Sequence, residues 1–229
     1  MWNIETSPIG RIAVPPSLPP GFAVFSTTRD YPGRIVPEEL TSLVRSRFGL
    51  ETSLTTCVQV HSATVTRAQR EQSWRECDAC DALWSAEKNV SLGIKVADCL
   101  PVSLLDTAHG AIANVHSGWR GAVARITANA LDAAPLDPAT THAYLGPSIR
   151  ACCFEVGEEV ATQFDARFLD RSRPKPHVDL VAFTIDILRA RGITKISDSG
   201  LCTRCDGSIF HSYRRDGAGK GRNLVLVAQ

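Results

Sequence analysis

The sequence predicts an α+β domain with a mixed β-sheet. Short runs of apolar, often β-branched residues are typical of buried strands, and segments with apolar residues at helical spacing lie between them. The two kinds of segment do not follow the even rhythm of a doubly wound parallel sheet. The chain has 229 residues, 44% of them hydrophobic, with no repeat or long polar linker. We therefore expect one domain over residues 1–229, with a sizeable core.

The first part of the chain contains few regular elements. Pro15-Pro16 and Pro19-Pro20 interrupt it early, so an edge strand and a loop are expected over 1–20. A strand rich in apolar residues is expected over 22–27. Proline in the first turn and Gly49 at the end predict a helix over 37–48.

The centre and the C-terminal part supply most of the expected strands. These strands are continuously apolar or β-branched and cover 58–65, 91–97, 101–105, 111–115, 143–145, 193–196 and 224–227. Apolar residues at helical spacing predict helices over 121–134, 157–164 and 182–191. The polar segment 170–177 contains prolines and is expected to be a loop inside the domain.

Charge and composition exclude several classes of protein. The 25 basic and 24 acidic residues give a net charge of +1, which argues against a dedicated nucleic-acid binder. No window approaches the roughly 18 apolar residues of a membrane helix, and the N-terminus does not resemble a signal peptide. We therefore expect a cytoplasmic protein whose eight cysteines are mostly reduced, some of them as metal ligands. The sequence does not indicate an oligomeric state.

Three metal-capable side chains follow apolar runs, namely His61, Cys99 and His116. Pro101 and Gly118 come shortly after two of them, and strand ends that border such turns commonly display catalytic groups. Two imidazoles and one thiolate complete three corners of a zinc tetrahedron and leave the fourth open, as in catalytic sites. The spacing alone also permits a plainer interpretation, because a single histidine at a strand end is more often a hydrogen-bonding residue.

These three segments belong to a longer series of motifs. In order along the chain they are Gln59-Val60-His61, Ala97-Asp98-Cys99-Leu100-Pro101, His116-Ser117-Gly118-Trp119-Arg120-Gly121, Leu145-Gly146-Pro147-Ser148-Ile149, Cys153-Phe154-Glu155-Val156-Gly157, Cys202-Thr203-Arg204-Cys205, Phe210-His211-Ser212-Tyr213-Arg214-Arg215-Asp216 and Gly221-Arg222. From about residue 20 to the C-terminus the chain resembles the laccase-domain (YfiH-like) family of purine nucleoside phosphorylases, formerly called polyphenol oxidases.

The resemblance implies a fold, a metal and an activity. The fold is an α/β/β/α layered arrangement of mixed sheets. The metal is zinc, held by His61, Cys99 and His116, and the same ligands also accept Cu²⁺. The activity is phosphorolysis of adenosine, inosine, guanosine and S-methyl-5'-thioadenosine, with adenosine deaminase activity in the same pocket. A purine nucleoside and phosphate are the implied partners.

The chain departs from the family pattern in three places. Ser62 stands where glycine is usual, Ser117 stands where alanine is frequent, and the segment 77–83 carries extra cysteines before its Asp-Ala-Leu. None of these changes removes a ligand of the implied zinc ion. They leave the preferred substrate open.

Phosphorolysis requires cations that bind a phosphate dianion, and the planar guanidinium of arginine suits this role. Arg120 is the first candidate, because it lies four residues after His116 at an expected helix start. Arg214, Arg215 and Arg222 are further candidates. Asp98 either orients a ligand histidine from behind or holds a turn.

Three other functions fit parts of the sequence. Cys99 and His116 also suit a cysteine hydrolase, such as an amidase acting on peptidoglycan precursors. A copper polyphenol oxidase would require many more histidines than the six present. A zinc-ribbon interaction module would use Cys77, Cys80, Cys202 and Cys205, although the two pairs are far apart for a ribbon. The remaining pair, Cys152-Cys153, is expected to pack in the core or a loop.

Overall fold

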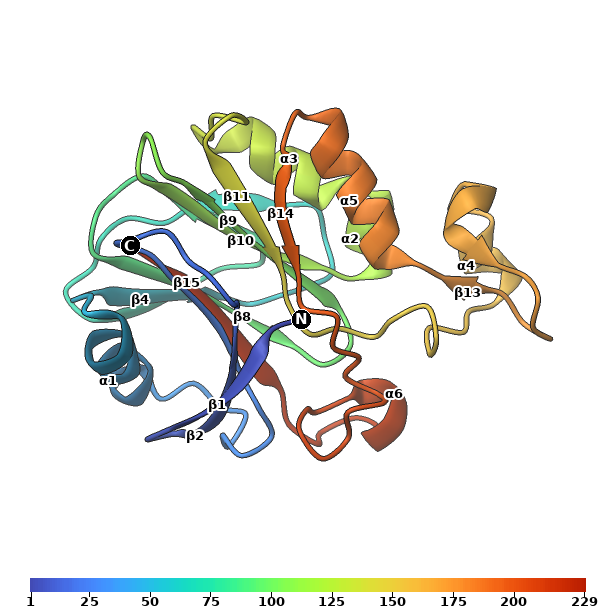
Figure 1. The fold of residues 1–229 in the computed structure, drawn as a ribbon, viewed down its shortest axis with the longest axis horizontal. Coiled ribbons are helices and arrows are strands. Elements are labelled where there is room, and N and C mark those ends of the chain that lie inside the picture. Colours follow the sequence, from blue (N-terminus) through green and yellow to red (C-terminus); the bar gives the residue numbers. More distant parts are fainter.

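Two large β-sheets pack face to face in the computed structural model, which describes residues 1–229 (Figure 1). The first sheet has the order β1-β2-β3-β15-β8-β4-β6, and its strands are β1 Asn3–Ser7, β2 Gly10–Val14, β3 Ala23–Thr27, β15 Asn223–Ala228, β8 Val90–Val96, β4 Ser53–Cys57 and β6 Trp74–Cys77. The second has the order β14-β11-β9-β10-β7-β5, and its strands are β14 Lys195–Asp198, β11 Thr141–Leu145, β9 Leu100–Asp106, β10 Ala111–Ser117, β7 Ala82–Ser85 and β5 Val65–Arg67. Both sheets combine parallel and antiparallel pairs.

Helices cover the outer faces of both sheets. The helices of the chain are α1 Pro37–Phe48, α2 Trp119–Val123, α3 Ile126–Ala133, α4 Glu158–Ala161, α5 Leu180–Ala190, α6 Tyr213–Asp216 and a short 3-10 helix Ala166–Phe168, and α1, α2, α3 and α5 provide this cover. Figure 1 shows α1 beside β4 on one side and α2, α3 and α5 over the other sheet. A two-stranded ribbon, β12 Leu169–Asp170 and β13 His177–Val178, extends from the main body with α4. The expected α+β class and layered arrangement are therefore confirmed.

Side chains that alternate between the two faces of each strand explain why both faces of each sheet are covered. In β15, Val227 packs between the two sheets, whereas Leu226 packs on the face that α1 covers. In β10, Ile112 points between the sheets and Ala113 toward the helices of the second sheet. Successive side chains of a strand point to opposite faces, so both faces of each sheet become buried. This accounts for the continuously apolar runs in the sequence.

The strand expected over 58–65 is wrong. Residues 58–64 form a loop between the end of β4 at Cys57 and the start of β5 at Val65. The backbone N–H groups of Val60, His61 and Ser62 in this loop bond to the Asp81 side chain instead of a neighbouring strand. The apolar residues of the segment therefore predicted a strand paired in a sheet, whereas hydrogen bonds to the buried Asp81 carboxylate take the place of that pairing.

The single helix expected over 121–134 is also wrong. The chain forms two helices, α2 and α3, because Arg125 adopts a left-handed conformation with φ of 65° between them. The helix expected over 157–164 is reduced to α4. By contrast, α1 has the expected bounds, and Gly49 ends it with a left-handed φ of 72° while its N–H bonds to the Arg45 carbonyl.

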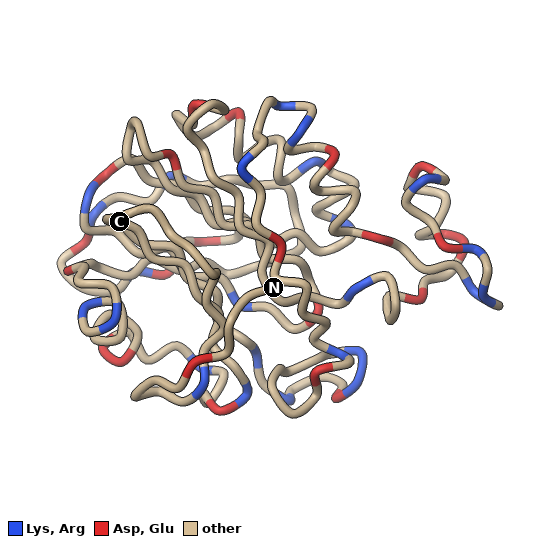
Figure 2. Tube along the Cα trace, viewed as in Figure 1, with Lys and Arg blue, Asp and Glu red and all other residues tan.

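Basic and acidic residues are interspersed over the whole trace (Figure 2). This distribution agrees with the near-zero net charge of the sequence. None of the helices combines the length and the apolar character that crossing a bilayer would require.

Candidate metal centre

Three side chains far apart in the sequence lie together at one surface, where His61 is exposed, Cys99 is half-buried and His116 is buried. The ligand atoms of His61, Cys99 and His116 all lie within 4.8 Å of one another. The Cys99 Sγ atom is 3.9 Å from His61 Nε2, and the two imidazole rings meet edge to face with centroids 4.9 Å apart. The group therefore offers one thiolate and two imidazole nitrogens to a single ion.

The second sheet positions two of these ligands. His116 lies near the end of β10, is buried, and its Nδ1 is 2.8 Å from Asp81 Oδ1, so its Nε2 is the atom available to a metal. Cys99 lies in the tight connection between β8 and β9, where Asp98 adopts a left-handed φ of 88°. The antiparallel pairing of β9 with β10 brings the two ligands to the same end of the sheet.

Asp81 holds the third ligand as well as His116. Its carboxylate accepts hydrogen bonds from the backbone N–H groups of Val60, His61 and Ser62 and from the Ser62 hydroxyl. Burial by itself raises the pKa of the Asp81 carboxyl, but hydrogen bonds from His116 and Ser62 lower it well below its usual range. One ionised carboxylate therefore sets the positions of two ligands.

The electrostatics of the site favour a thiolate. Burial alone raises the pKa of the Cys99 thiol, but hydrogen bonding to His116 and His61 outweighs it and lowers the pKa to about 6. Burial lowers the pKa of His116, whereas hydrogen bonds to Asp81 and Cys99 raise it to about 9. A thiolate beside a proton-bearing imidazole is an arrangement in which a cation can replace the proton.

Gly118 leaves the room that an ion and its ligands need. A Cβ atom at this position would lie 3.0 Å from Cys99 Sγ and 3.2 Å from His61 Cδ2. The donor set of two nitrogens and one sulfur is typical of zinc, with the fourth corner open to the pocket. The residues present therefore fit the metal that the family resemblance implies.

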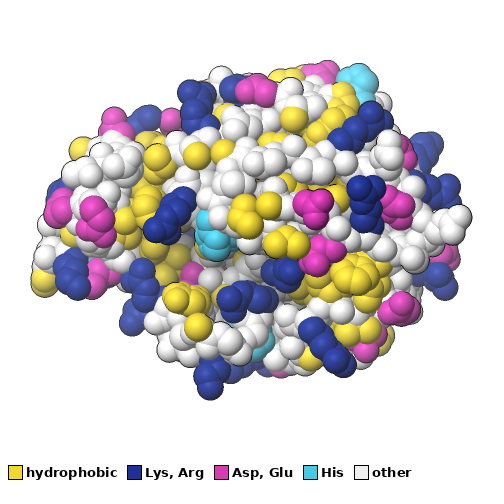
Figure 3. All heavy atoms as spheres, turned by 180° about the vertical axis from the view of Figure 1, so that it is seen from behind, with side chains coloured by type: hydrophobic (Ala, Val, Ile, Leu, Met, Phe, Trp, Pro, Cys, Tyr) yellow, Lys and Arg dark blue, Asp and Glu magenta, His cyan; other side chains and the backbone are white.

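The centre lies in a cavity of about 1190 Å³. In the space-filling view from behind, a histidine side chain lies in a hollowed region between hydrophobic and basic side chains (Figure 3). Trp119, Ile149, Phe154 and Val156 supply apolar lining. The cavity thus combines a metal-capable centre with surfaces suited to a flat apolar ring.

Three of the four candidate arginines line this cavity. Arg120 stacks over the Trp119 ring at 4.3 Å, Arg214 donates to the Glu155 carbonyl, and Arg222 donates to the Gly221 carbonyl. None of the three forms a salt bridge with a carboxylate. Their positive charges are therefore available to an anion in the cavity.

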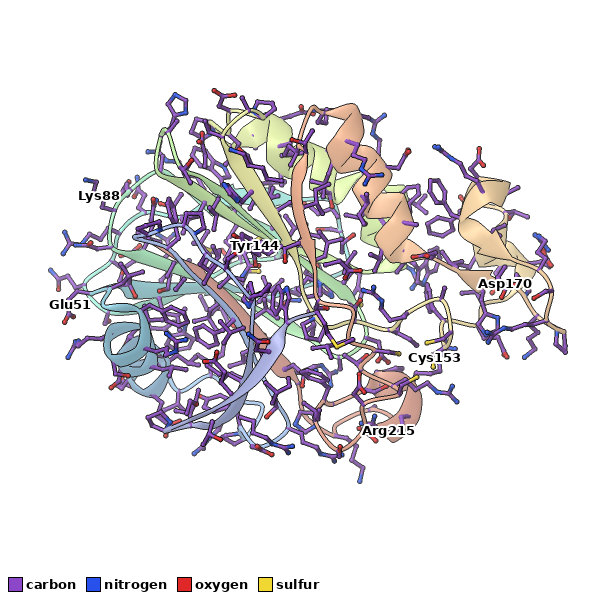
Figure 4. All side chains as sticks on the ribbon, viewed as in Figure 1. Glu51, Lys88, Tyr144, Cys153, Asp170 and Arg215 are labelled. Carbon is purple, nitrogen blue, oxygen red and sulfur yellow. The ribbon has the colours of Figure 1, made fainter.

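The structure places the fourth arginine, Arg215, outside the cavity. Its guanidinium bonds to the Asp216 carboxylate and to the carbonyls of Thr203, Arg204 and Phe210. In Figure 4 the labelled Arg215 lies at α6, away from the sheets. Because its donors already bond to groups of the chain, Arg215 has a structural role and does not belong to the candidate anion site.

Asp98 does not contact a ligand histidine. Its carboxylate accepts hydrogen bonds from the Thr203 hydroxyl at 2.6 Å and from the Arg214 N–H at 2.7 Å. It therefore holds the start of α6 against the turn that carries Cys99. The orienting role belongs to Asp81, whose only sequence signal was the Asp-Ala-Leu segment noted for its extra cysteines.

The zinc-ribbon interpretation is wrong. Cys77 and Cys80 are buried in the core between the two sheets, whereas Cys202 and Cys205 lie in the loop before α6. The two pairs do not form one group. Of the six histidines, only His61 and His116 join a metal-capable group, which leaves no histidine set for multicopper chemistry.

Fold and site together define a class: a layered α+β protein in which two histidines and one cysteine form a metal-capable group that lines a large pocket. Comparison with known proteins agrees. The chain belongs to the multi-copper polyphenol oxidoreductase laccase family, whose model matches residues 26–229. The resemblance seen in the motifs is therefore confirmed.

Several relatives carry enzyme names. The chain is 32% identical to Adenosine deaminase RL5 from an unknown prokaryotic organism, over 90% of this chain and 94% of that protein. It is 37% identical to a purine nucleoside phosphorylase of Deinococcus radiodurans, over 74% of this chain and 67% of the relative. A purine nucleoside phosphorylase of Pseudomonas aeruginosa is 36% identical over 74% and 71% of the two chains.

Solved structures share the fold. Neisseria meningitidis protein NMB0706 superposes with a TM-score of 0.78 and 27% identity, covering 99% of this chain and 98% of that one. YlmD from Geobacillus stearothermophilus superposes with a TM-score of 0.76 and 22% identity, covering 93% and 94%, and supports the fold alone.

Proposed function

We propose that this protein is a zinc-dependent purine nucleoside phosphorylase. Its proposed substrates are adenosine, inosine, guanosine and S-methyl-5'-thioadenosine, and adenosine is also deaminated in the same pocket. One observation carries the proposal: a metal-capable centre and three arginines without carboxylate partners line the same cavity. The names of the relatives support the choice of substrate.

His61, Cys99 and His116 would hold the zinc ion. When bound there, zinc supplies a Lewis acid that polarises substrate oxygen or nitrogen and lowers the pKa of water. Asp81 fixes the tautomer of His116, which leaves Nε2 as the atom that would hold the ion. The same carboxylate holds the loop of His61, which limits reorganisation when substrate binds.

The cavity residues divide the remaining work between the purine and the phosphate. Trp119 and Phe154 provide flat apolar surfaces for the base. Arg120, Arg214 and Arg222 would bind the phosphate dianion and hold one of its oxygens against the ribose anomeric carbon. That oxygen forms the new bond to carbon while the bond from carbon to the purine nitrogen breaks, and the proton of the hydrogen phosphate ends on the departing base. The products are free base and the sugar 1-phosphate, which is ribose 1-phosphate for adenosine, inosine and guanosine and 5-methylthioribose 1-phosphate for S-methyl-5'-thioadenosine.

The test is a panel of nucleosides incubated with and without phosphate on protein of known metal content. Free base, ribose 1-phosphate and inosine from adenosine are measured. We expect base release to require phosphate and to be lost in His116→Ala together with the metal at this centre. Retention of that metal and of turnover in His116→Ala would refute the proposal.

The arginine role is tested by Arg120→Ala. We expect the KM for phosphate to rise by roughly tenfold or more, because one charge-assisted contact is removed, while deamination changes little. Arg189→Ala is the matched control, since Arg189 is exposed on α5 and outside the cavity. Equal losses of both activities in Arg120→Ala would assign the residue a structural role instead.

A cysteine hydrolase is the second candidate, favoured by the lowered pKa of Cys99 beside His116. In that case the thiolate attacks an amide carbonyl, such as one in a peptidoglycan precursor, and needs no metal. Chelation distinguishes the two functions. Loss of activity on chelation, restored by Zn²⁺, supports the phosphorylase, whereas full activity of the metal-free protein supports the hydrolase.

A further inference from the structure

A second group of metal-capable side chains lies away from the histidine-containing centre. It consists of four cysteines from two loops, Cys152 and Cys153 after β11 and Cys202 and Cys205 before α6. Their sulfur atoms all lie within 4.8 Å of one another. In Figure 4, yellow sulfur atoms gather around the labelled Cys153, between the second sheet and α6.

Four of the six sulfur–sulfur separations are close to the edge of a tetrahedron around one ion. The distances are 3.7 Å for Cys152–Cys153, 3.7 Å for Cys152–Cys202, 3.8 Å for Cys152–Cys205 and 3.3 Å for Cys153–Cys205. Four thiolates bound to zinc at about 2.3 Å stand about 3.8 Å apart, because that is the edge of the tetrahedron. A disulfide would require a pair at about 2.05 Å, and all four cysteines are free.

We propose that these four cysteines bind one Zn²⁺ ion as a closed structural site, separate from the histidine-containing centre. Four sulfur ligands leave no corner open, as in structural and unlike catalytic sites. An iron–sulfur cluster has the same ligands, but its own iron and sulfide atoms hold the cysteine sulfurs further apart than this group allows. The site therefore has the size of a single ion.

Nearby charges suit such an ion. A zinc ion with four thiolates has a net negative charge, and two arginines lie beside the group. Arg173 donates to the Cys152 carbonyl, and Arg204 is within hydrogen-bonding reach of Cys153.

The ion would join two walls of the substrate cavity. Cys153 directly precedes Phe154, which lines the cavity. Thr203, between the other two cysteines, donates to Asp98 next to Cys99, and Asp98 in turn accepts from the N–H of Arg214. Through these contacts a zinc ion would fix the loop, α6 and the metal-bearing turn relative to one another.

Metal analysis of the whole protein, purified under reducing conditions, tests the proposal. Wild type is expected to contain about two zinc ions per chain, and Cys205→Ser about one. His116→Ala should also contain about one, and its zinc X-ray absorption spectrum should fit four sulfurs at about 2.3 Å. Cys77→Ser is the matched control, since Cys77 is buried in the core between the sheets, and it should keep the wild-type content.

The outcomes separate this site from the proposed function. One zinc ion that is lost in Cys205→Ser and kept in His116→Ala supports the tetrathiolate site and refutes the histidine-containing one. The reverse pattern refutes the tetrathiolate site. If Cys205→Ser fails to fold, the spectrum of the wild type decides: a first shell of mainly sulfur supports the proposal, and a shell of mainly nitrogen or oxygen overturns it.

Discussion

At the scale of single residues, Asp81 organises the candidate metal centre although it does not line the cavity. Its buried carboxylate bonds to His116 and to the N–H groups of the loop that carries His61. A carboxylate has enough lone pairs to accept all of these bonds, whereas an amide has one oxygen. The precision of the site therefore depends on one side chain behind the ligands.

We predict that Asp81→Asn weakens metal binding by about 10- to 100-fold, because an amide N–H would face the N–H donors of the loop. Competition with a chromogenic chelator measures the dissociation constant. Asp106→Asn is the control, since Asp106 is equally buried and pairs with His109 far from the centre. Unchanged metal affinity in Asp81→Asn would show that the ligands are positioned without this carboxylate.

At the scale of elements, the site forms where strands end and turn. β10 carries His116 and leads through Gly118 into α2, which carries Arg120. Cys99 and His61 pack closely against this connection, where a Cβ atom on residue 118 would lie 3.0 Å from Cys99 Sγ. The metal centre and the proposed anion site are therefore joined by one strand–helix junction.

We predict that Gly118→Ala yields a folded protein that has lost most of the metal from this centre. The added methyl group would lie 3.0 Å from Cys99 Sγ and so displace the ligand. Metal content and circular dichroism are the two measurements. Ser117→Ala is the adjacent control: its buried hydroxyl has no hydrogen-bond partner, so stability and metal content should both be kept. Normal metal content in Gly118→Ala would contradict this account.

At the scale of the whole molecule, a buried amide connects the two sheets. Asn114 of β10 donates to the carbonyls of Leu92 and Val225 in the other sheet and accepts from Ser103. The surrounding layer is apolar, and buried polar groups there must be satisfied. This residue therefore fixes how the sheets lie relative to one another.

We predict that Asn114→Ala lowers the free energy of unfolding by about 2–4 kcal/mol, because it removes three buried hydrogen bonds and leaves a gap. Urea denaturation measures the change. Asn129→Ala should cost only about 1 kcal/mol, since Asn129 makes one bond to the Ala63 carbonyl. Similar small losses in both variants would show that the sheets are held by apolar packing alone.

The sequence by itself determined the class of fold, the strands with continuous apolar runs and the family, because periodicity and motifs are local properties of the chain. It also singled out the three side chains that meet at the metal centre. It missed β6 and β7, and it predicted a strand over 58–65 where the apolar residues lie in a loop. Local pattern does not reveal a carboxylate that replaces strand pairing from 20 residues away.

Only the tertiary structure decided which side chains meet across loops. In the structure Asp81 lies behind His116, and the donors of Arg215 bond to other groups of the chain. Cys77 and Cys80 lie in the core, whereas Cys152, Cys153, Cys202 and Cys205 form a group of four. Spacing suggested the wrong partners for Cys202 and Cys205, because chain separation says little about distance once two sheets have packed together. These contacts join residues that are distant in the sequence, so they depend on the fold of the whole chain and cannot be predicted from any single segment.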